Sequence, residues 1–139
     1  MQATIKWVDG VMFVGETGSG HAVVMDGPPD HGGRNIGMRP MEMLLLGVGG
    51  CSSIDVVQFL QKGRNHIVNC VAELTAERVD AVPSVFSKIH LHFIVSGKDL
   101  NPATVERAVK LSAEKYCSAS IMLGNAGVEI THDFEVIEV

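Results

Sequence analysis

The sequence predicts an α+β protein in which helices pack against antiparallel sheets, with elements in the order βββ, long helix, ββ, helix, β. Short alternating segments separated by glycine occupy the N-terminal part, and one long apolar run follows Pro40. The alternating pattern then returns twice before a second helical segment and once after it. The chain has 139 residues, so we expect one domain over residues 1–139.

The N-terminal segment is expected to form a three-stranded meander. Residues 3–8 alternate, Asp9-Gly10 is a strong hairpin signal, and residues 11–16 form the second strand. The stretch TGSG marks another turn before a third strand at 21–26. Residues 27–39 are rich in glycine and proline, which predicts a long loop of the kind that is usually functional or mobile.

The next element is predicted to be a buried helix that begins at Pro40 and ends at Gly63. It would have about 23 residues and a length of about 35 Å. Its apolar residues spread over more than one stripe, so we expect most of its circumference to be buried. Gly47, Gly49 and Gly50 each cost the helix about 0.5–1 kcal/mol, a cost that close approach to another helix or strand would offset.

The C-terminal half predicts three strands and a second helix. The strands are expected at residues 69–79, 87–97 and 128–139, because apolar residues alternate there. Asn101 and Pro102 are typical of the cap and first turn of a helix, which would end near Cys117. One short helical turn is expected directly after it.

Composition limits the classes of function. The net charge is −5 and there is no basic stripe, which argues against nucleic-acid binding. Residues 41–60 resemble a membrane span, but Glu42, Asp55 and Gln58 favour a soluble helix. The N-terminus lacks the apolar region of a signal peptide, so we expect a cytoplasmic protein.

Two of the three cysteines lie on the predicted helices. Cys51 shares the buried face of the first helix and Cys117 ends the second, so the two side chains could meet. The alternative is that each is a small buried apolar residue, as free cysteines usually are. Cys70 lies on an ordinary strand and is expected to be structural.

These residues carry a family resemblance. The stretches RPMEMLLLGVGGCSSIDVV and LSAEKYCSASIML, with SKIHLHFIV and VEITHDFEV, resemble the OsmC/Ohr family of osmotically inducible and organic hydroperoxide resistance proteins. The chain is most similar to the YhfA-like branch. The resemblance implies an intertwined homodimer with active sites at the subunit interface.

The resemblance also implies a thiol peroxidase that needs no cofactor or metal. Cys51 would attack an organic hydroperoxide and become a sulfenic acid, Cys117 would condense with it to a disulfide, and an external dithiol would reduce the disulfide. Because Cys51 lies in the middle of its own helix, no helix N-terminus stabilises its thiolate there, and a cation must come from elsewhere in the fold.

The chain departs from the family pattern at two catalytic positions. Hydroperoxide resistance enzymes use an arginine in the early meander, where His21 is the nearest candidate here; Arg39 is another, as are Arg34 and His31. Met41 stands at the position of the family's glutamate and Glu42 follows it. On a straight helix Glu42 lies about 13 Å from Cys51 along the axis, so it is too far to reach its own Cys51 but could reach the partner subunit's cysteine across an antiparallel crossing, and which cysteine it serves stays open.

These departures keep a second reading open. The alternative function is a non-enzymatic dimer that binds a small hydrophobic ligand at its interface, with Cys51 structural or redox-sensing. His90 and His92 form a possible metal pair, but their neighbours Leu91 and Phe93 define the apolar face of the strand, so we expect both histidines to face solvent.

Overall fold

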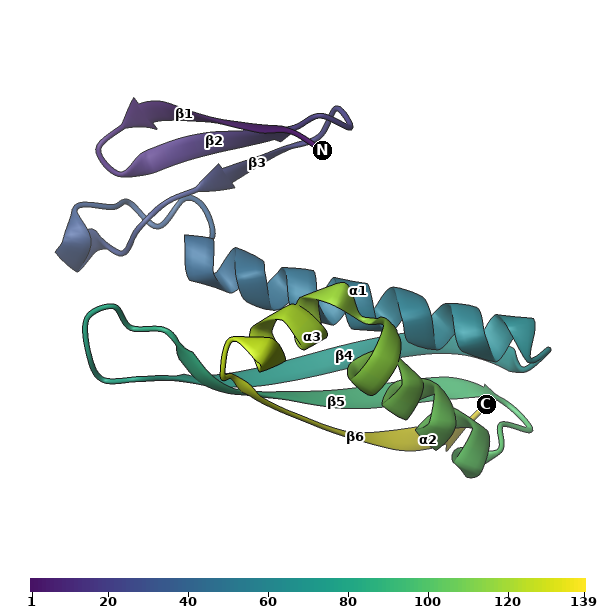
Figure 1. The fold of residues 1–139 in the computed structure, drawn as a ribbon. Helices are drawn as coiled ribbons and strands as arrows, with labels where there is room; N and C mark the ends of the chain where they lie inside the picture. Colours follow the sequence, from purple (N-terminus) through teal and green to yellow (C-terminus); the bar gives the residue numbers. More distant parts are fainter. The chain divides into compact units, whose positions relative to one another are not determined.

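The computed structural model describes residues 1–139, which form two compact units, Met1–Leu44 and Leu45–Val139. The first unit holds an antiparallel sheet of three strands in the order β1-β2-β3 (Figure 1). Its strands are β1 (Ala3–Asp9), β2 (Met12–Thr17) and β3 (Ala22–Met25), followed by the 3-10 turn η1 (Pro29–His31). The predicted meander is confirmed.

The first hairpin turns where the sequence indicates. Gly10 has a φ of 55°, a left-handed conformation that side chains disfavour. The indole nitrogen of Trp7 donates to the carbonyl oxygen of Gly10 at 2.9 Å, which ties the turn to the strand before it. The Asp9-Gly10 hairpin signal therefore has a local backbone cause.

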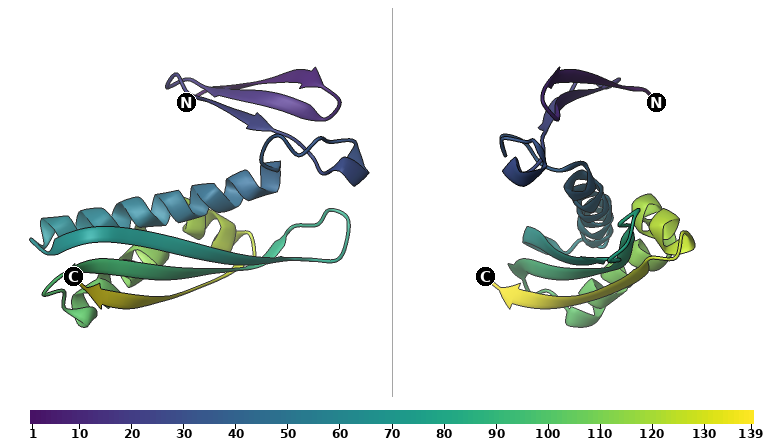
Figure 2. Two further views of the ribbon diagram at one scale, coloured as in Figure 1. Left: turned by 180° about the vertical axis from the view of Figure 1, so that it is seen from behind. Right: turned by 90° about the vertical axis from the view of Figure 1, so that its left-hand side faces the viewer.

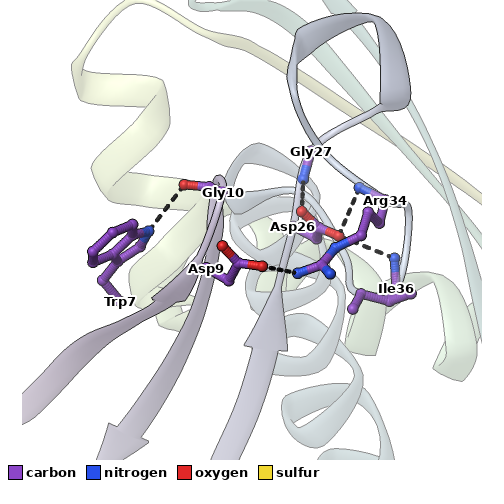
Figure 3. Close-up of polar contacts among 7 residues, drawn as sticks. All are labelled: Trp7, Asp9, Gly10, Asp26, Gly27, Arg34 and Ile36. Carbon is purple, nitrogen blue, oxygen red and sulfur yellow. Dashed lines mark hydrogen bonds and ion pairs between the residues drawn. The ribbon is translucent and has the colours of Figure 1, made fainter.

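The loop after β3 is ordered around Asp26 (Figure 3). The carboxylate is 3% exposed and accepts hydrogen bonds from the backbone N–H groups of Gly27 (2.8 Å), Arg34 (3.0 Å) and Ile36 (3.2 Å). These bonds, the one from Gly27 foremost, lower the pKa of Asp26 even though burial opposes them. The guanidinium of Arg34 also pairs with Asp9 at 2.9 Å. The backbone of this loop is thus held in place by hydrogen bonds to one buried carboxylate.

Helix α1 (Pro40–Lys62) begins and ends as predicted. The N–H of Gly63 donates to the carbonyl of Phe59 at 3.0 Å and closes its last turn. The expectation that most of its circumference is buried is wrong for the single chain, because Leu46 is 61% and Ile54 60% exposed. A sheet covers only one side of a helix, so within the chain α1 buries one face, formed by Val48, Gly49, Ser52, Val56 and Leu60.

Of the three helix glycines, only Gly49 marks a close approach within the chain. A Cβ atom at Gly49 would lie 2.9 Å from Cδ1 of Leu74, on the adjacent strand. At Gly47 and Gly50 a Cβ atom would meet nothing within 4 Å. The packing of this chain therefore explains Gly49 and leaves the other two unexplained.

The sheet of the second unit is mixed, which corrects the expectation of antiparallel sheets. It contains β4 (His66–Arg78), β5 (Phe86–Lys98) and β6 (Glu129–Glu138) in the order β4-β5-β6. β4 and β5 pair antiparallel, but β5 and β6 pair parallel. Two parallel strands need a crossover connection, and here helices supply it.

That crossover contains more helix than the sequence predicted. Helix α2 (Pro102–Leu111) starts at the predicted cap, where the side chain of Asn101 accepts from the N–H of Ala103 at 2.9 Å. A π-helical segment, η2 (Ser112–Tyr116), follows, and then α3 (Ser118–Asn125), a complete helix and not a single turn.

The helices of the second unit lie against one face of its sheet (Figures 1 and 2). The core strand β5 points four side chains at them, none more than 1% exposed: Ile89, Leu91, Phe93 and Val95. Helix α1 has the length and apolar composition of a membrane span, yet its buried face packs within this unit.

Candidate active site

The structure brings Cys51 and Cys117 together from different parts of the chain. Cys51 lies in the middle of α1, and Cys117 lies between the π-helical segment and α3. The two thiols lie close enough for each to shift the pKa of the other, and both are free. Cys51 is half-buried, whereas Cys117 is 0% exposed. A small molecule therefore reaches Cys51 more easily than Cys117.

Hydrogen-bond donors surround the sulfur of Cys117. The hydroxyl of Ser52 donates to it at 3.1 Å, and the backbone N–H of Ser120 donates at 3.4 Å. The hydroxyls of Ser52 and Ser120 lie 3.4 Å apart, so both serines occupy one polar pocket in an apolar core. Cys117 is also the N-cap residue of α3, where the helix dipole favours negative charge.

The π-helical segment sets the position of Cys117. The N–H of Cys117 donates to the carbonyl of Ser112 at 2.8 Å, which closes the wide turn. The Ser112 hydroxyl lies 3.3 Å from the carbonyl oxygen of Ser52 and 3.1 Å from Oδ2 of Asp55. Ser112 therefore links the segment before Cys117 to the helix that carries Cys51.

The two thiols differ in acidity. Burial raises the pKa of Cys117, but hydrogen bonds from Ser120, Ser52 and Cys51 outweigh it, so the pKa lies below its usual value. Burial also raises the pKa of Cys51, and its interaction with Cys117 adds to that rise, which the backbone N–H groups at the start of α3 offset only in part. The hydrogen-bond donors that favour a thiolate therefore converge on the sulfur of Cys117.

Backbone N–H groups in the first turn of α3 favour the thiolate forms of the cysteines, and nothing in the sequence indicated them. The N–H groups of Ser118 and Ala119 lower the pKa of Cys51, against the larger effect of burial, while the N–H of Ser120 faces Cys117. A helix N-terminus thus does face both sulfurs, although it belongs to a helix other than the one that carries Cys51. The pKa of Cys51 nevertheless stays above its usual value, so the expectation that a cation elsewhere in the fold favours its ionisation stays a prediction.

Sequence reasoning missed the serines of this pocket. Ser52, Ser112 and Ser120 are each no more than 2% exposed. Two signals could have found them. Ser52 and Ser112 fall on the apolar faces of their helical segments, and Ser120 stands three residues after a potential N-cap.

The other predicted site residues lie in the first unit. His21 contacts Ser19 (Nδ1–Oγ 3.1 Å) in the second turn of the meander. Glu42 accepts a hydrogen bond from the N–H of Arg39 at 2.8 Å, which caps the start of α1, and Arg39 itself donates from Nη1 to the carbonyl of Gly37 at 3.0 Å. Their predicted roles at the cysteines stay predictions.

The remaining loop candidates lie beside surface carboxylates. Arg34 binds Asp9, and Nδ1 of His31 lies 3.2 Å from Asp30. The third cysteine, Cys70, is half-buried on β4, and burial raises the pKa of its thiol.

His90 and His92 lie on the face of β5 opposite the core and share one carboxylate. Oδ1 of Asp133 lies 3.2 Å from Nε2 of His90 and 2.6 Å from Nδ1 of His92, and His90 also contacts Thr131 at 2.7 Å. The bond to Asp133 raises the pKa of His92. No group of three or more histidine, cysteine, aspartate or glutamate residues has a metal-binding arrangement.

A mixed sheet with helices on one face and two free cysteines close together on the helical segments defines an α+β protein with a paired-thiol site. The chain belongs to the OsmC family, since residues 31–133 match the model described as OsmC-like protein. It is 54% identical to Protein YhfA of Escherichia coli K12 over 99% of this chain and 98% of that protein.

Solved structures share the fold along the whole chain. A structural genomics protein, 52% identical, covers 100% of both chains with a TM-score of 0.90. A Legionella pneumophila protein named as organic hydroperoxide resistance protein OsmC and predicted redox protein is 16% identical. It covers 100% of this chain and 98% of its own with a TM-score of 0.68. At that identity the likeness concerns the fold alone.

Proposed function

We propose that the protein is a cytoplasmic, thiol-dependent peroxidase that reduces organic hydroperoxides in defence against oxidative stress. The observation that supports this most directly is the closeness of the half-buried Cys51 to the buried Cys117, each of which shifts the pKa of the other, with hydrogen-bond donors at the sulfur of Cys117. An accessible thiol beside a second, ionisable thiol is the arrangement that a two-cysteine peroxidase needs.

The reaction has three steps. The Cys51 thiolate attacks the terminal oxygen of the hydroperoxide, the O–O bond breaks, and the alkoxide leaves as the alcohol after it gains a proton. The sulfenic acid on Cys51 is then attacked by Cys117, so that an S–S bond forms and the hydroxyl leaves as water. An external dithiol exchanges with this disulfide and restores both thiols.

Apolar surface supports a homodimer as the working form. Exposed apolar side chains occur in both units, among them Trp7, Leu46 and Ile54. Such residues favour burial by a second copy of the chain. In that dimer Glu42, Arg39 and His21 are the candidates to complete the site of the partner subunit. Size-exclusion chromatography with light scattering should give the mass of two chains.

Peroxide titration tests the enzyme. Reduced protein is mixed with a small excess of cumene hydroperoxide, and free thiols are counted. Wild type should lose two thiols per chain, Cys70→Ser should lose the same two, and Cys51→Ser should lose none. Cys70→Ser is the matched control, because it removes a thiol outside the pair. Slow loss that Cys51→Ser does not alter would contradict the peroxidase.

A specific observation keeps a binding function as the second candidate. The first unit contains an open hollow of about 520 Å³, lined among others by Ile5, Val11, Phe13 and Met25. A largely apolar hollow suits a small hydrophobic ligand. Under this alternative, cumene hydroperoxide leaves the thiols intact, while an apolar fluorescent probe binds with the same affinity in wild type and Cys51→Ser.

A further inference from the structure

The π-helical segment before Cys117 makes a turn that is one residue longer than an α-helical turn. The N–H of Cys117 donates at 2.8 Å to the carbonyl of Ser112, five residues back, where an α-helix would use Ala113, four residues back. One residue corresponds to about 100° of rotation around the axis of an α-helix. The π-helical turn therefore decides which way the side chain of Cys117 points, and here the hydroxyl of Ser52 donates to its sulfur at 3.1 Å.

Two hydrogen bonds tie this turn to α1. Ser112, the first residue of the turn, is 0% exposed, and its hydroxyl faces two acceptors: Oδ2 of Asp55 at 3.1 Å and the carbonyl oxygen of Ser52 at 3.3 Å. The bond to the carboxylate is the stronger, because a charged acceptor makes a hydrogen bond about twice as strong as a neutral one does. Asp55 lies one turn after Cys51 on α1, so it fixes the π-helical turn close to that cysteine.

We propose that the hydrogen bond between Asp55 and Ser112 holds the π-helical turn and thereby keeps Cys117 in place to resolve the sulfenic acid on Cys51. Asp55 and Ser112 are positioning residues, since they act through the backbone of the turn and neither reacts. This inference rests on the proposed peroxidase function for its use. Without the bond, the turn relaxes toward an α-helix and the sulfur of Cys117 rotates away from that of Cys51.

The hydrogen bond bears on one step of the reaction. When the Cys51 thiolate attacks the hydroperoxide, no atom of the π-helical turn changes its bonds. In the next step the sulfur of Cys117 attacks the sulfenic sulfur, so that the S–S bond forms and the S–O bond breaks. The departing hydroxide takes up the proton that the Cys117 thiol gives up and leaves as water. The rate of this step depends on how well the two sulfurs are held together. A sulfenic acid that is not resolved is open to further oxidation.

The reduction potential of the disulfide tests the positioning role without peroxide. Each variant carries Cys70→Ser and is equilibrated in dithiothreitol redox buffers. Asp55→Ala should make the disulfide about tenfold less favourable, because the relaxed turn must return to its π-helical form before the S–S bond can form. That factor equals a rise of about 30 mV in the potential. Asp55→Asn keeps an oxygen acceptor for the Ser112 hydroxyl and should restore most of the difference.

Trapping in a single turnover separates the two steps. Reduced protein is mixed with one equivalent of cumene hydroperoxide and with dimedone, and mass spectrometry gives the amounts of Cys51 adduct and of disulfide. Asp55→Ala should form the disulfide about tenfold more slowly and give mainly the adduct, while hydroperoxide disappears at the rate of wild type. Glu114→Ala, the matched control, removes an exposed carboxylate from the turn and should behave as wild type. A residue that only supports the fold would slow both steps.

A double variant shows whether Asp55 acts through Ser112. Ser112→Ala should slow disulfide formation at least as much as Asp55→Ala, and adding Asp55→Ala to it should change nothing further. If Ser112→Ala does not fold, Asp55→Ala decides alone, since there Ser112 keeps the Ser52 carbonyl as acceptor. An unchanged potential in Asp55→Ala, or effects of the two substitutions that multiply, would overturn the proposal. A raised potential in a protein that consumes no peroxide would overturn the proposed function and leave the positioning role standing.

Discussion

Replacing the helix glycines one at a time tests how α1 approaches the sheet. Gly49→Ala adds a Cβ atom 2.9 Å from Cδ1 of Leu74, a distance that real Cβ atoms avoid, so the Leu74 side chain must shift. Alanine gains about 1 kcal/mol of helix propensity over glycine, and overpacking a well-filled core costs about 1–3 kcal/mol. Because the nearest atom is the end of a flexible side chain, the lower half of that range applies. We therefore expect Gly49→Ala to destabilise the fold by about 0–1 kcal/mol.

Gly47→Ala and Gly50→Ala are the matched controls. At both positions the new methyl group meets nothing within 4 Å in the chain, so only the helix propensity changes. Each should stabilise the protein by about 0.5–1 kcal/mol.

Urea unfolding measures all three free energies of unfolding, and it is done at one protein concentration because the stability of any oligomer depends on concentration. The reasoning is refuted if Gly49→Ala stabilises the protein as much as the controls do. Concentration-dependent destabilisation by either control would instead indicate that this glycine packs against another copy of the chain in an oligomer.

Three further predictions follow from single contacts. Asp26→Asn should speed hydrogen exchange in residues 27–36. Because the pKa of Asp26 is lower in the folded than in the unfolded chain, where it is about 3.9, its carboxylate stabilises the fold above that pH, and this stabilisation is lost as the pH falls through the folded pKa. Asp26→Asn should therefore make the free energy of unfolding depend less on pH in acid. The protonated His92 stabilises the fold fully below its unfolded pKa of about 6.5, and this stabilisation declines as the pH rises through the higher folded pKa. His92→Asn should remove it, so the melting temperatures measured at acid and at alkaline pH should differ less in the variant than in wild type. Asn101→Ala should cost about 1 kcal/mol, as the N-cap bond of α2 is lost, whereas Asn101→Ser should cost a few tenths at most; equal losses in thermal unfolding would contradict the capping role.

The ends of elements could be predicted because they depend on neighbouring residues. Pro40 begins α1, Gly63 follows its last residue, and Asn101 caps α2, each at the residue the pattern indicates. A cap or a stop acts on its own backbone within about one turn, so the local sequence contains the whole cause.

The parallel pairing of β5 and β6 could not be predicted in the same way. An alternating strand pattern is identical in parallel and antiparallel neighbours. The direction of β6 follows from the path through α2 and α3, and α3 was expected only as one turn. Without that helix, the donors at its N-terminus were also missed.

The sequence by itself determined the helix and strand types, most of their boundaries and the presence of two cysteines on helical segments, because periodicity and caps are local properties. Only the tertiary structure decided that Cys117 lies beside Cys51, that Ser52 donates to its sulfur and that α3 aims its N–H groups at the pair. Hydrogen bonds between residues this far apart in the chain depend on how the helices pack on the sheet, and no local pattern contains that information.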